Sequence, residues 1–393
     1  MSEISYASRV RGCLLGGALG DALGAPLEFL GLEEIRERFG KGGLRDLERA
    51  YGRVGAITDD TQMTLFTAEG LIRAWVRGDA RGLCDPAAIV HHAYLRWLHT
   101  QGDPWREIAG APGEEEPDGW LVQERWLHAR RAPGRTCLGA LRGAHGLGTP
   151  ARNDSKGCGG VMRVAPVGLL PHTGTGGERE IEEIFRLGVE TAALTHGHVT
   201  GQLPAGVLAA ALFSIVREGR PLGPALDAAT GLLRAWPHHG ETLRALERAR
   251  ALAARGGVTA ERLESLGGGW IAEEALAIAV AAALAHPGPE ALWEALVLAA
   301  NHSGDSDSTA AIAGNLLGAL HGEGALPAGA LAELEGREAI ARLADDFAAE
   351  MEGTRPRHGT SSSVAQVDDG TPLAEPVPPA AGLEAWWERY PGW

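Results

Sequence analysis

Two short acidic stretches, far apart in the chain, carry the residue types best suited to chemistry. The first reads Thr58-Asp59-Asp60-Thr61 and the second reads Asp305-Ser306-Asp307-Ser308-Thr309. Each stretch places two carboxylates and neighbouring hydroxyls just before a helical segment, where burying them unpaired would cost several kcal/mol. A divalent cation removes that conflict, and oxygen ligands suit magnesium, manganese or calcium. We interpret the stretches as halves of one metal site, with ordinary helix capping as the alternative for each.

A glycine-rich stretch provides a second candidate function. Residues 153–163 read Asn-Asp-Ser-Lys-Gly-Cys-Gly-Gly-Val-Met-Arg, and we expect an apolar helix to begin near Val161. Exposed amides at such a helix start favour a phosphate group. The stretch is not a Walker loop, because the Gly-Lys-Ser/Thr order is missing. A purely structural loop is the alternative.

Two further motifs contain histidine and tryptophan. His196 lies in Leu194–His198, between two expected helices, and His302 precedes the second acidic stretch. A single histidine at a helix end more often caps the helix or orients another group than acts as a catalyst. Three glycines precede Trp270 and could let a base or sugar approach the backbone, whereas the expected role of Trp270 itself is packing.

The first expected helix carries glycines at every fourth position. Gly12, Gly16, Gly20 and Gly24 therefore share one helical face. Glycine costs roughly 1 kcal/mol against alanine inside a helix, so such a row indicates close approach of another group. We expect tight helix packing at Gly12 and Gly16, and a ligand site near Gly20 and Gly24, which flank Asp21.

Helical periodicity dominates the elements that must position these residues. Period-2 alternation of β-branched residues is nearly missing from the sequence, so the predicted fold class is all-α. The expected helices are Tyr6–Leu23, Asp60–Arg77, Pro86–Thr100, Leu121–Arg131, Thr136–His145, Glu178–Leu194, Thr200–Arg217, Leu222–Trp236, Glu241–Ala254, Ala272–Ala285, Pro289–Ala300, Ser308–Leu320 and Arg337–Met351.

We expect one domain over residues 1–352 and a tail over residues 353–393. The two acidic stretches lie on either side of every polar joint, so a shared metal requires a single domain. Residues 353–379 are rich in Pro, Ser, Thr and Gly, which is typical of a loose segment. The aromatic end, residues 386–393, is expected to dock back on the domain, with an oligomer contact as the alternative.

Composition limits the classes of partner. The chain has 393 residues, of which 45% are hydrophobic and 22% charged, with a formal charge of −15. This charge argues against an extended nucleic-acid surface, because phosphate contacts need clustered cations. The four cysteines are scattered, and the sequence shows neither a signal pattern nor an apolar run near 18 residues. We therefore expect reduced thiols, a cytoplasmic location and no membrane partner.

Taken in order, the motifs resemble those of the ADP-ribosylglycohydrolase family. The resemblance spans residues 12 to about 320. The matching segments are Gly16–Glu28, Thr58–Thr61, Gly157–Arg163, Thr195–His196 and Gly304–Thr309.

The resemblance implies a compact, single-domain orthogonal helical bundle with a binuclear magnesium or manganese centre in a cleft. It implies Glu28 as a mobile glutamate near the metal or the substrate ribose, and catalytic roles for Glu28, Asp59 and Asp60. The implied metal ligands are Thr58, Asp59, Asp60, Asp305, Asp307 and Ser308. The implied contacts to ADP-ribose are Glu28, Gly157, Cys158, Gly159, Gly160, Val161, Met162 and His196.

This chain departs from the family pattern at two positions. Many relatives have Gly-Asn-Gly where this chain has Gly157-Cys158-Gly159, and several have threonine where it has Ser308. The hydroxyl at 308 is kept, so metal binding is expected to survive. The altered loop bears on the leaving group of the substrate.

The expected function is metal-dependent hydrolysis of the bond between ADP-ribose and an acceptor. The acceptor could be a protein arginine or serine, a nucleobase or an O-acetyl group. The alternatives are an inactive ADP-ribose-binding module, a metal-dependent phosphohydrolase and a purely structural helical protein. The expected partner is ADP-ribose or an ADP-ribosylated substrate, and the protein is expected to be a monomer or a small homo-oligomer.

Overall fold

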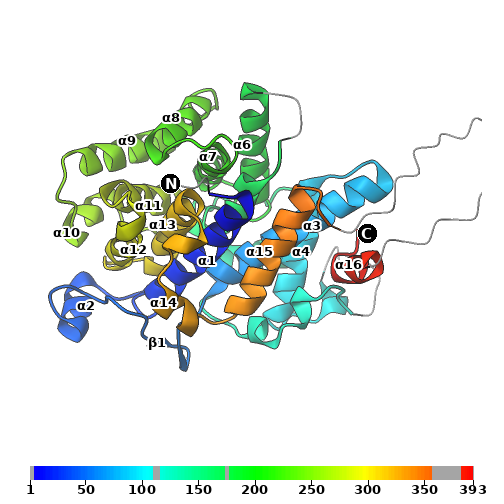
Figure 1. The fold of residues 1–393 in the computed structure, drawn as a ribbon, viewed down its shortest axis with the longest axis horizontal. Helices are drawn as coiled ribbons and strands as arrows, with labels where there is room; N and C mark the ends of the chain where they lie inside the picture. The colour runs from blue at the N-terminus through cyan, green and yellow to red at the C-terminus, as the bar shows by residue number, and fades with distance from the viewer. Residues whose placement is uncertain (1–3, 109–115, 173–176, 356–381, 393) are drawn as a thin grey trace, which may run out of the picture.

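The computed structural model describes residues 4–108, 116–172, 177–355 and 382–392. These residues form helices joined by loops, with one two-residue hairpin of β1 (Arg49–Ala50) and β2 (Arg53–Val54). The all-α prediction is confirmed. The helices, shown in Figure 1, are α1 Tyr6–Gly24, α2 Leu32–Phe39, α3 Asp59–Arg81, α4 Pro86–Thr100, α5 Arg135–Arg142, α6 Glu178–Ala193, α7 Val199–Val216, α8 Leu222–Leu233, α9 Gly240–Ala254, α10 Ala260–Leu263, α11 Ala272–Ala285, α12 Leu292–Ala300, α13 Ser306–His321, α14 Ala328–Glu333, α15 Arg337–Met351 and α16 Leu383–Arg389.

Helices α1 and α13 pack backbone to backbone in the interior, although they are far apart in the sequence. A Cβ atom on Gly16 would lie 2.6 Å from the carbonyl oxygen of Gly314, and one on Gly20 would lie 2.1 Å from that of Ala310. The residue numbers run in opposite directions along the contact, so the helices are antiparallel. The expected tight packing at Gly16 is confirmed. The ligand site expected near Gly20 is wrong, because the backbone of α13 fills that space.

Two expected helices are replaced by short 3₁₀ turns. Leu121–Arg131 contains the turns Leu121–Gln123 and Arg125–His128, interrupted at Glu124, whose ψ of 103° is extended. The helix expected from Val161 is also wrong. The glycine-rich stretch instead forms the turn Cys158–Gly160, and a second turn at Ala165–Leu169 follows. In the second segment, glycine and proline weaken the α-helix relative to tighter turns.

Helix α7 is the most apolar long helix among the described residues. Its 18 residues have a mean hydropathy of 1.7, which is long and apolar enough to cross a membrane. However, 89% of the helix is buried inside the protein, as expected for the central helix of a globular core. Figure 1 shows it surrounded by neighbouring helices, including α6 and α8.

The C-terminal helix α16 packs beside α3 and α15 (Figure 1). The indole nitrogen of Trp386 donates to Glu350 Oε2 at 3.1 Å, and the Tyr390 hydroxyl donates to Asp346 Oδ2 at 2.7 Å. Both aromatic side chains are buried. Residues 356–381, which carry most of the expected loose segment, lie outside the described residues, so the division at residue 352 stays a prediction.

Candidate functional site

One cavity of about 660 Å³ brings the two acidic stretches together. It lies between the start of α3, the start of α13, the residues after α1 and the glycine-rich loop. Three of the predicted residues, Thr58, Gly160 and Val161, do not line it. The predicted residues that do line it are Glu28, Asp59, Asp60, Gly157, Cys158, Gly159, Met162, His196, Asp305, Asp307 and Ser308.

Asp21, on α1, holds the start of α3 from behind the cavity. Its carboxylate accepts hydrogen bonds from the Thr58 amide at 2.9 Å, the Thr58 hydroxyl at 2.8 Å and the Thr61 amide at 3.0 Å. The Thr58 hydroxyl in turn accepts from the Asp60 amide at 3.3 Å. Thr58 therefore caps α3 behind the acidic pair, and its expected role as a metal ligand stays a prediction. We assigned no role to Asp21 from the sequence, although an acidic residue in a glycine-lined, apolar helix was a usable signal.

The second acidic stretch is held by α1 and by the glycine-rich loop. A Cβ atom on Gly24 would lie 2.4 Å from the Asp307 amide nitrogen, so Gly24 supports the site without reaching a ligand. Asp305 caps α13 and accepts from the Ser308 amide at 3.3 Å. The Cys158 thiol donates to Asp305 Oδ2 at 2.8 Å. The contacts made by Gly24 and Cys158 join segments separated by well over a hundred residues.

The clustered carboxyl groups repel one another strongly. Burial raises the pKa of Glu28 to about 11, and the charges of Asp307 and Asp305 add to the shift. Burial also raises the pKa of Asp60 well above its usual range, again with a contribution from Asp307. Oxygen atoms Glu28 Oε2 and Asp60 Oδ1 are buried without a hydrogen-bond partner. A cation would relieve both the repulsion and the missing contacts.

The donor set fits a hard divalent cation, because it consists of carboxylate and hydroxyl oxygens with unpaired atoms among them. Within the described ranges, however, no group of three or more His, Cys, Asp and Glu side chains is drawn together tightly enough to hold an ion. The structure therefore does not show the expected binuclear centre. It shows the residues that could form one around a common space.

The glycine-rich loop uses several of its amides internally. The Cys158 amide donates to the Trp270 carbonyl at 3.2 Å, and the Met162 amide donates to the Cys158 carbonyl at 3.1 Å. Glycine is needed at 159, because a Cβ there would lie 2.7 Å from Cys137 Sγ. Gly157, Cys158, Gly159 and Met162 still face the cavity, while the buried Val161 belongs to the core.

His196 faces the cavity as a neutral imidazole. Its Nδ1 lies 2.8 Å from the Thr195 hydroxyl, and burial together with the positive charge of Arg163 lowers its pKa to about 3. It can therefore offer a hydrogen bond but not a positive charge at neutral pH. His302 does not line the cavity, and its Nε2 lies 2.9 Å from the Thr309 hydroxyl, which agrees with an orienting role.

Trp270 is not the packing residue that the sequence suggested. It is 43% exposed, lines the cavity and stacks on Phe29, with ring centroids 5.3 Å apart. The sequence contains no local signal for this pair, because Phe29 and Trp270 meet only in the folded chain.

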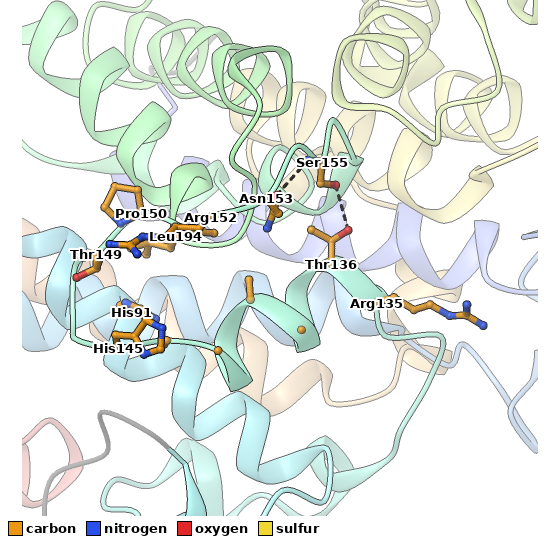
Figure 2. Close-up of a pocket in the computed structure, with 15 residues that line it drawn as sticks. His91, Arg135, Thr136, His145, Thr149, Pro150, Arg152, Asn153, Ser155 and Leu194 are labelled. Carbon is orange, nitrogen blue, oxygen red and sulfur yellow. Dashed lines mark hydrogen bonds between the residues drawn. The ribbon is translucent and has the colours of Figure 1, made fainter.

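A second cavity, of about 400 Å³, borders the first and shares Arg135 and Thr136 with it. Figure 2 shows the hydrogen bond of 3.0 Å between the hydroxyls of Thr136 and Ser155 at this border. No carboxylate lines this second space in the described part of the chain, and His91 lies at its far end (Figure 2). None of the sequence motifs predicts this second cavity.

The fold and the site define an all-α protein with an acidic cavity between helix N-termini. The family model described as ADP-ribosylglycohydrolase matches residues 2–357, and the chain belongs to this family. The resemblance seen in the sequence motifs is thus confirmed over nearly the whole chain.

Three known proteins show how similar the chain is to its relatives in sequence and structure. The ADP-ribosylarginine hydrolase Tri1 of Pseudomonas putida is 26% identical over 86% of this chain and 77% of its own. The ADP-ribosyl-[dinitrogen reductase] glycohydrolase of Rhodospirillum rubrum is 36% identical over 26% of this chain and 32% of its own. A solved structure named ADP-ribosylglycohydrolase-related protein complex is 25% identical, covers 88% of this chain and 99% of its own, and superposes with a TM-score of 0.58.

Proposed function

We propose that the protein is a metal-dependent hydrolase that cleaves the bond between ADP-ribose and an acceptor. The observation that carries the proposal is the meeting of five carboxyl groups, two of them with unpaired buried oxygens, in one cavity of a family member. The names of the relatives support ADP-ribose as the common part of the substrate. We retain a cytoplasmic location and a monomeric or small oligomeric state as predictions.

The residues that would hold two divalent cations, magnesium or manganese, are those with oxygens on the cavity wall. Asp59, Asp60, Asp305, Asp307 and Ser308 meet this condition, and Thr58 orients them from behind. When bound, such cations supply a water of lowered pKa and orient the ribose hydroxyls.

The protein itself supplies charge, proton transfer and binding contacts. Cleavage at the anomeric carbon passes through an oxocarbenium-like state, and carboxylates around the cavity stabilise its positive charge. Glu28, with its raised pKa and an unpaired oxygen, is placed to give or take a proton. The loop Gly157–Met162 and neutral His196 would contact the diphosphate and the distal ribose.

The test is a panel of substrates carrying ADP-ribose on arginine, serine, a nucleobase and an acetyl group, each assayed with magnesium and with manganese. We expect release of free ADP-ribose from at least one substrate, loss of release in excess chelator, and recovery when metal is added back. Replacement Asp60→Asn should lower turnover by 10²-fold or more, on the order of the loss when a transition-state contact is removed.

Three outcomes would contradict the proposal in different ways. Binding of ADP-ribose without turnover of any substrate would favour the inactive binding module. Release of AMP instead of ADP-ribose would favour the phosphohydrolase. Full turnover in excess chelator would remove the metal from the mechanism.

A further inference from the structure

We propose that Cys158 adds a sulfur ligand to the cation site of the acidic cavity, so that this site binds a thiophilic divalent cation, Zn²⁺, through the thiolate. The inference rests on the cation site of the proposed function. It goes beyond that proposal, because the ligands assigned there are all oxygens, which suit hard cations. Zinc, in contrast, accepts thiolate and carboxylate ligands together.

The first observation is the position of the Cys158 thiol against the second acidic stretch. Cys158 lines the cavity, and its Sγ lies 2.8 Å from Asp305 Oδ2, to which it donates a hydrogen bond. The Ser308 hydroxyl donates to the same sulfur at 3.7 Å. The fold thus brings a thiol, a carboxylate and a hydroxyl to one point, although Cys158 and Asp305 are 147 residues apart in the chain.

These separations suit atoms that share one ion. With bonds of about 2.3 Å to sulfur and about 2.1 Å to oxygen, the sulfur and oxygen ligands of a tetrahedral zinc ion lie about 3.6 Å apart. The Ser308 oxygen already lies close to that distance from Sγ, and the Asp305 oxygen needs to move outward by about 0.8 Å. On binding, the thiol proton leaves to the solvent and a sulfur–metal bond replaces the S–H bond.

The second observation is a carboxylate oxygen without a partner on the first acidic stretch. Asp60 is 3% exposed and lines the same cavity, and its Oδ1 is buried without a hydrogen-bond partner. Such an oxygen is costly unless a cation or a donor reaches it. No three His, Cys, Asp or Glu side chains are tightly grouped in the described part of the chain. Asp60 therefore has to close on the ion from across the cavity, as the fourth ligand.

The other three thiols of the chain are not placed to hold a cation there. Cys137 also lines the cavity, but Arg163 Nη1 lies 3.3 Å from its sulfur, and the guanidinium charge repels a cation. Cys13 is fully buried within α1, and Cys84 lies between α3 and α4, outside the cavity wall. Cys137 is therefore the matched control for Cys158, because it offers a thiol in the same cavity in the wrong electrostatic setting.

The main test is the absorption of Co²⁺, a spectroscopic substitute for zinc, added to the metal-free full-length protein. A thiolate bound to Co²⁺ gives an intense near-ultraviolet charge-transfer band that oxygen ligands do not give. We expect the band in the wild type and in Cys137→Ser. It should be lost in Cys158→Ser, whose hydroxyl can still donate to Asp305. A wild type without the band, or a band that persists in Cys158→Ser, would overturn the proposal.

Calorimetric titration separates a sulfur ligand from a structural role of Cys158. Cys158→Ser should weaken Zn²⁺ binding by at least about 10-fold, the scale seen when even an outer partner of a metal ligand is lost. The same variant should change Mn²⁺ binding by less than about 3-fold, because manganese prefers oxygen ligands. Equal weakening of both cations would show a structural role instead, and unchanged Zn²⁺ binding would exclude the sulfur.

A measurement on the wild type alone does not depend on how a variant folds. With Zn²⁺ at about ten times its Kd, roughly one tenth of the sites stay free, so alkylation of Cys158 by iodoacetamide should slow about 10-fold. Mass spectrometry follows the reaction, and the partly exposed Cys84 should react at an unchanged rate. Alkylation of Cys158 at the same rate with and without Zn²⁺ would contradict a sulfur–metal bond.

These readouts keep the inference separate from the proposed function, because none of them needs turnover. Zinc bound through Cys158 in a protein that hydrolyses no ADP-ribosylated substrate would remove the proposed function and leave the thiolate site. Hydrolysis that depends on magnesium or manganese, in a protein without the cobalt–sulfur band, would do the reverse.

Discussion

At the residue scale, burial decides which groups carry charge. The acidic cluster has raised pKa values because water is excluded and like charges are close. The same exclusion keeps buried imidazoles neutral. His91 accepts the Gly148 amide at 3.1 Å through Nδ1, and burial, assisted by the charge of Arg163, lowers its pKa to about 4. Burial thus shifts the pKa values both of the carboxyl groups in the acidic cavity and of His91.

His91 provides a prediction of pH dependence. Its folded pKa of about 4 lies below the ordinary value of 6.5, so the unfolded chain binds the proton more readily. Stability from this group is complete well above pH 6.5 and is lost as pH falls from 6.5 towards 4. In His91→Asn the side-chain oxygen can accept the same amide without titrating. The wild type should lose about 1–2 kcal/mol more unfolding free energy than the variant between pH 7 and pH 5, measured by urea denaturation. Equal losses in both proteins would show that His91 does not contribute.

At the element scale, the contact between α1 and α13 is what builds the site. Its glycines let the backbones touch, so Asp21 reaches the start of α3 while Gly24 supports Asp307. The acidic stretches are short, and neither could position its partner from a distance of more than two hundred residues along the chain. The contact between α1 and α13 therefore sets the relative positions of the two acidic stretches.

Gly20→Ala tests this contact. The added Cβ would lie 2.1 Å from the Ala310 carbonyl oxygen, so the helices must separate. We expect a loss of about 1–3 kcal/mol in unfolding free energy, typical of overpacking, together with reduced turnover because α13 carries Asp305 and Asp307. Chemical denaturation and the hydrolysis assay would measure both.

The matched control is Gly231→Ala on α8, where the added atom meets open space. Relief of the glycine entropy cost should make this variant more stable by about 0.5–1 kcal/mol, with normal turnover. If Gly20→Ala behaved like the control, the close packing would not govern the site.

At the scale of the whole molecule, α16 contributes no residue to the wall of the acidic cavity. It contacts α15 through Glu350 and Asp346, and the Gly392 carbonyl accepts from Arg77, near the opposite end of α3 from Asp59. Figure 1 shows α16 at one edge of the molecule, beside α3 and α15. The contacts of α16 thus stabilise the fold without forming part of the cavity wall.

Trp386→Ala tests that separation. Trp386 is 4% exposed, and removing a buried tryptophan typically costs about 3 kcal/mol or more. We expect a lower free energy of unfolding with turnover per folded molecule unchanged, checked by denaturation and by assay at a temperature where the variant is folded. Glu388→Ala, an exposed substitution on the same helix, should leave both unchanged. A large loss of turnover in Trp386→Ala would mean that α16 communicates with the cavity.

The sequence by itself determined most helices and the residue types of the site. Periodicity placed α4, α11 and α15 with the observed bounds, because apolar spacing, caps and backbone hydrogen bonds within a helix are local. The acidic stretches also predicted a site with oxygen ligands, and the glycine-rich loop predicted a site formed by backbone amides. The helix expected from Val161 is wrong because Pro166 and Gly168 within it, and Gly159 and Gly160 just before it, favour short turns.

Only the tertiary structure decided which of these groups face one another. It joined Thr58 to Asp21 by a hydrogen bond, exposed Trp270 against Phe29, and formed a second cavity beside the first. These outcomes depend on contacts between segments remote in the chain, above all the glycine faces of α1 on α13. Such contacts are set by the three-dimensional fit of whole helices, and no short window of sequence contains both partners.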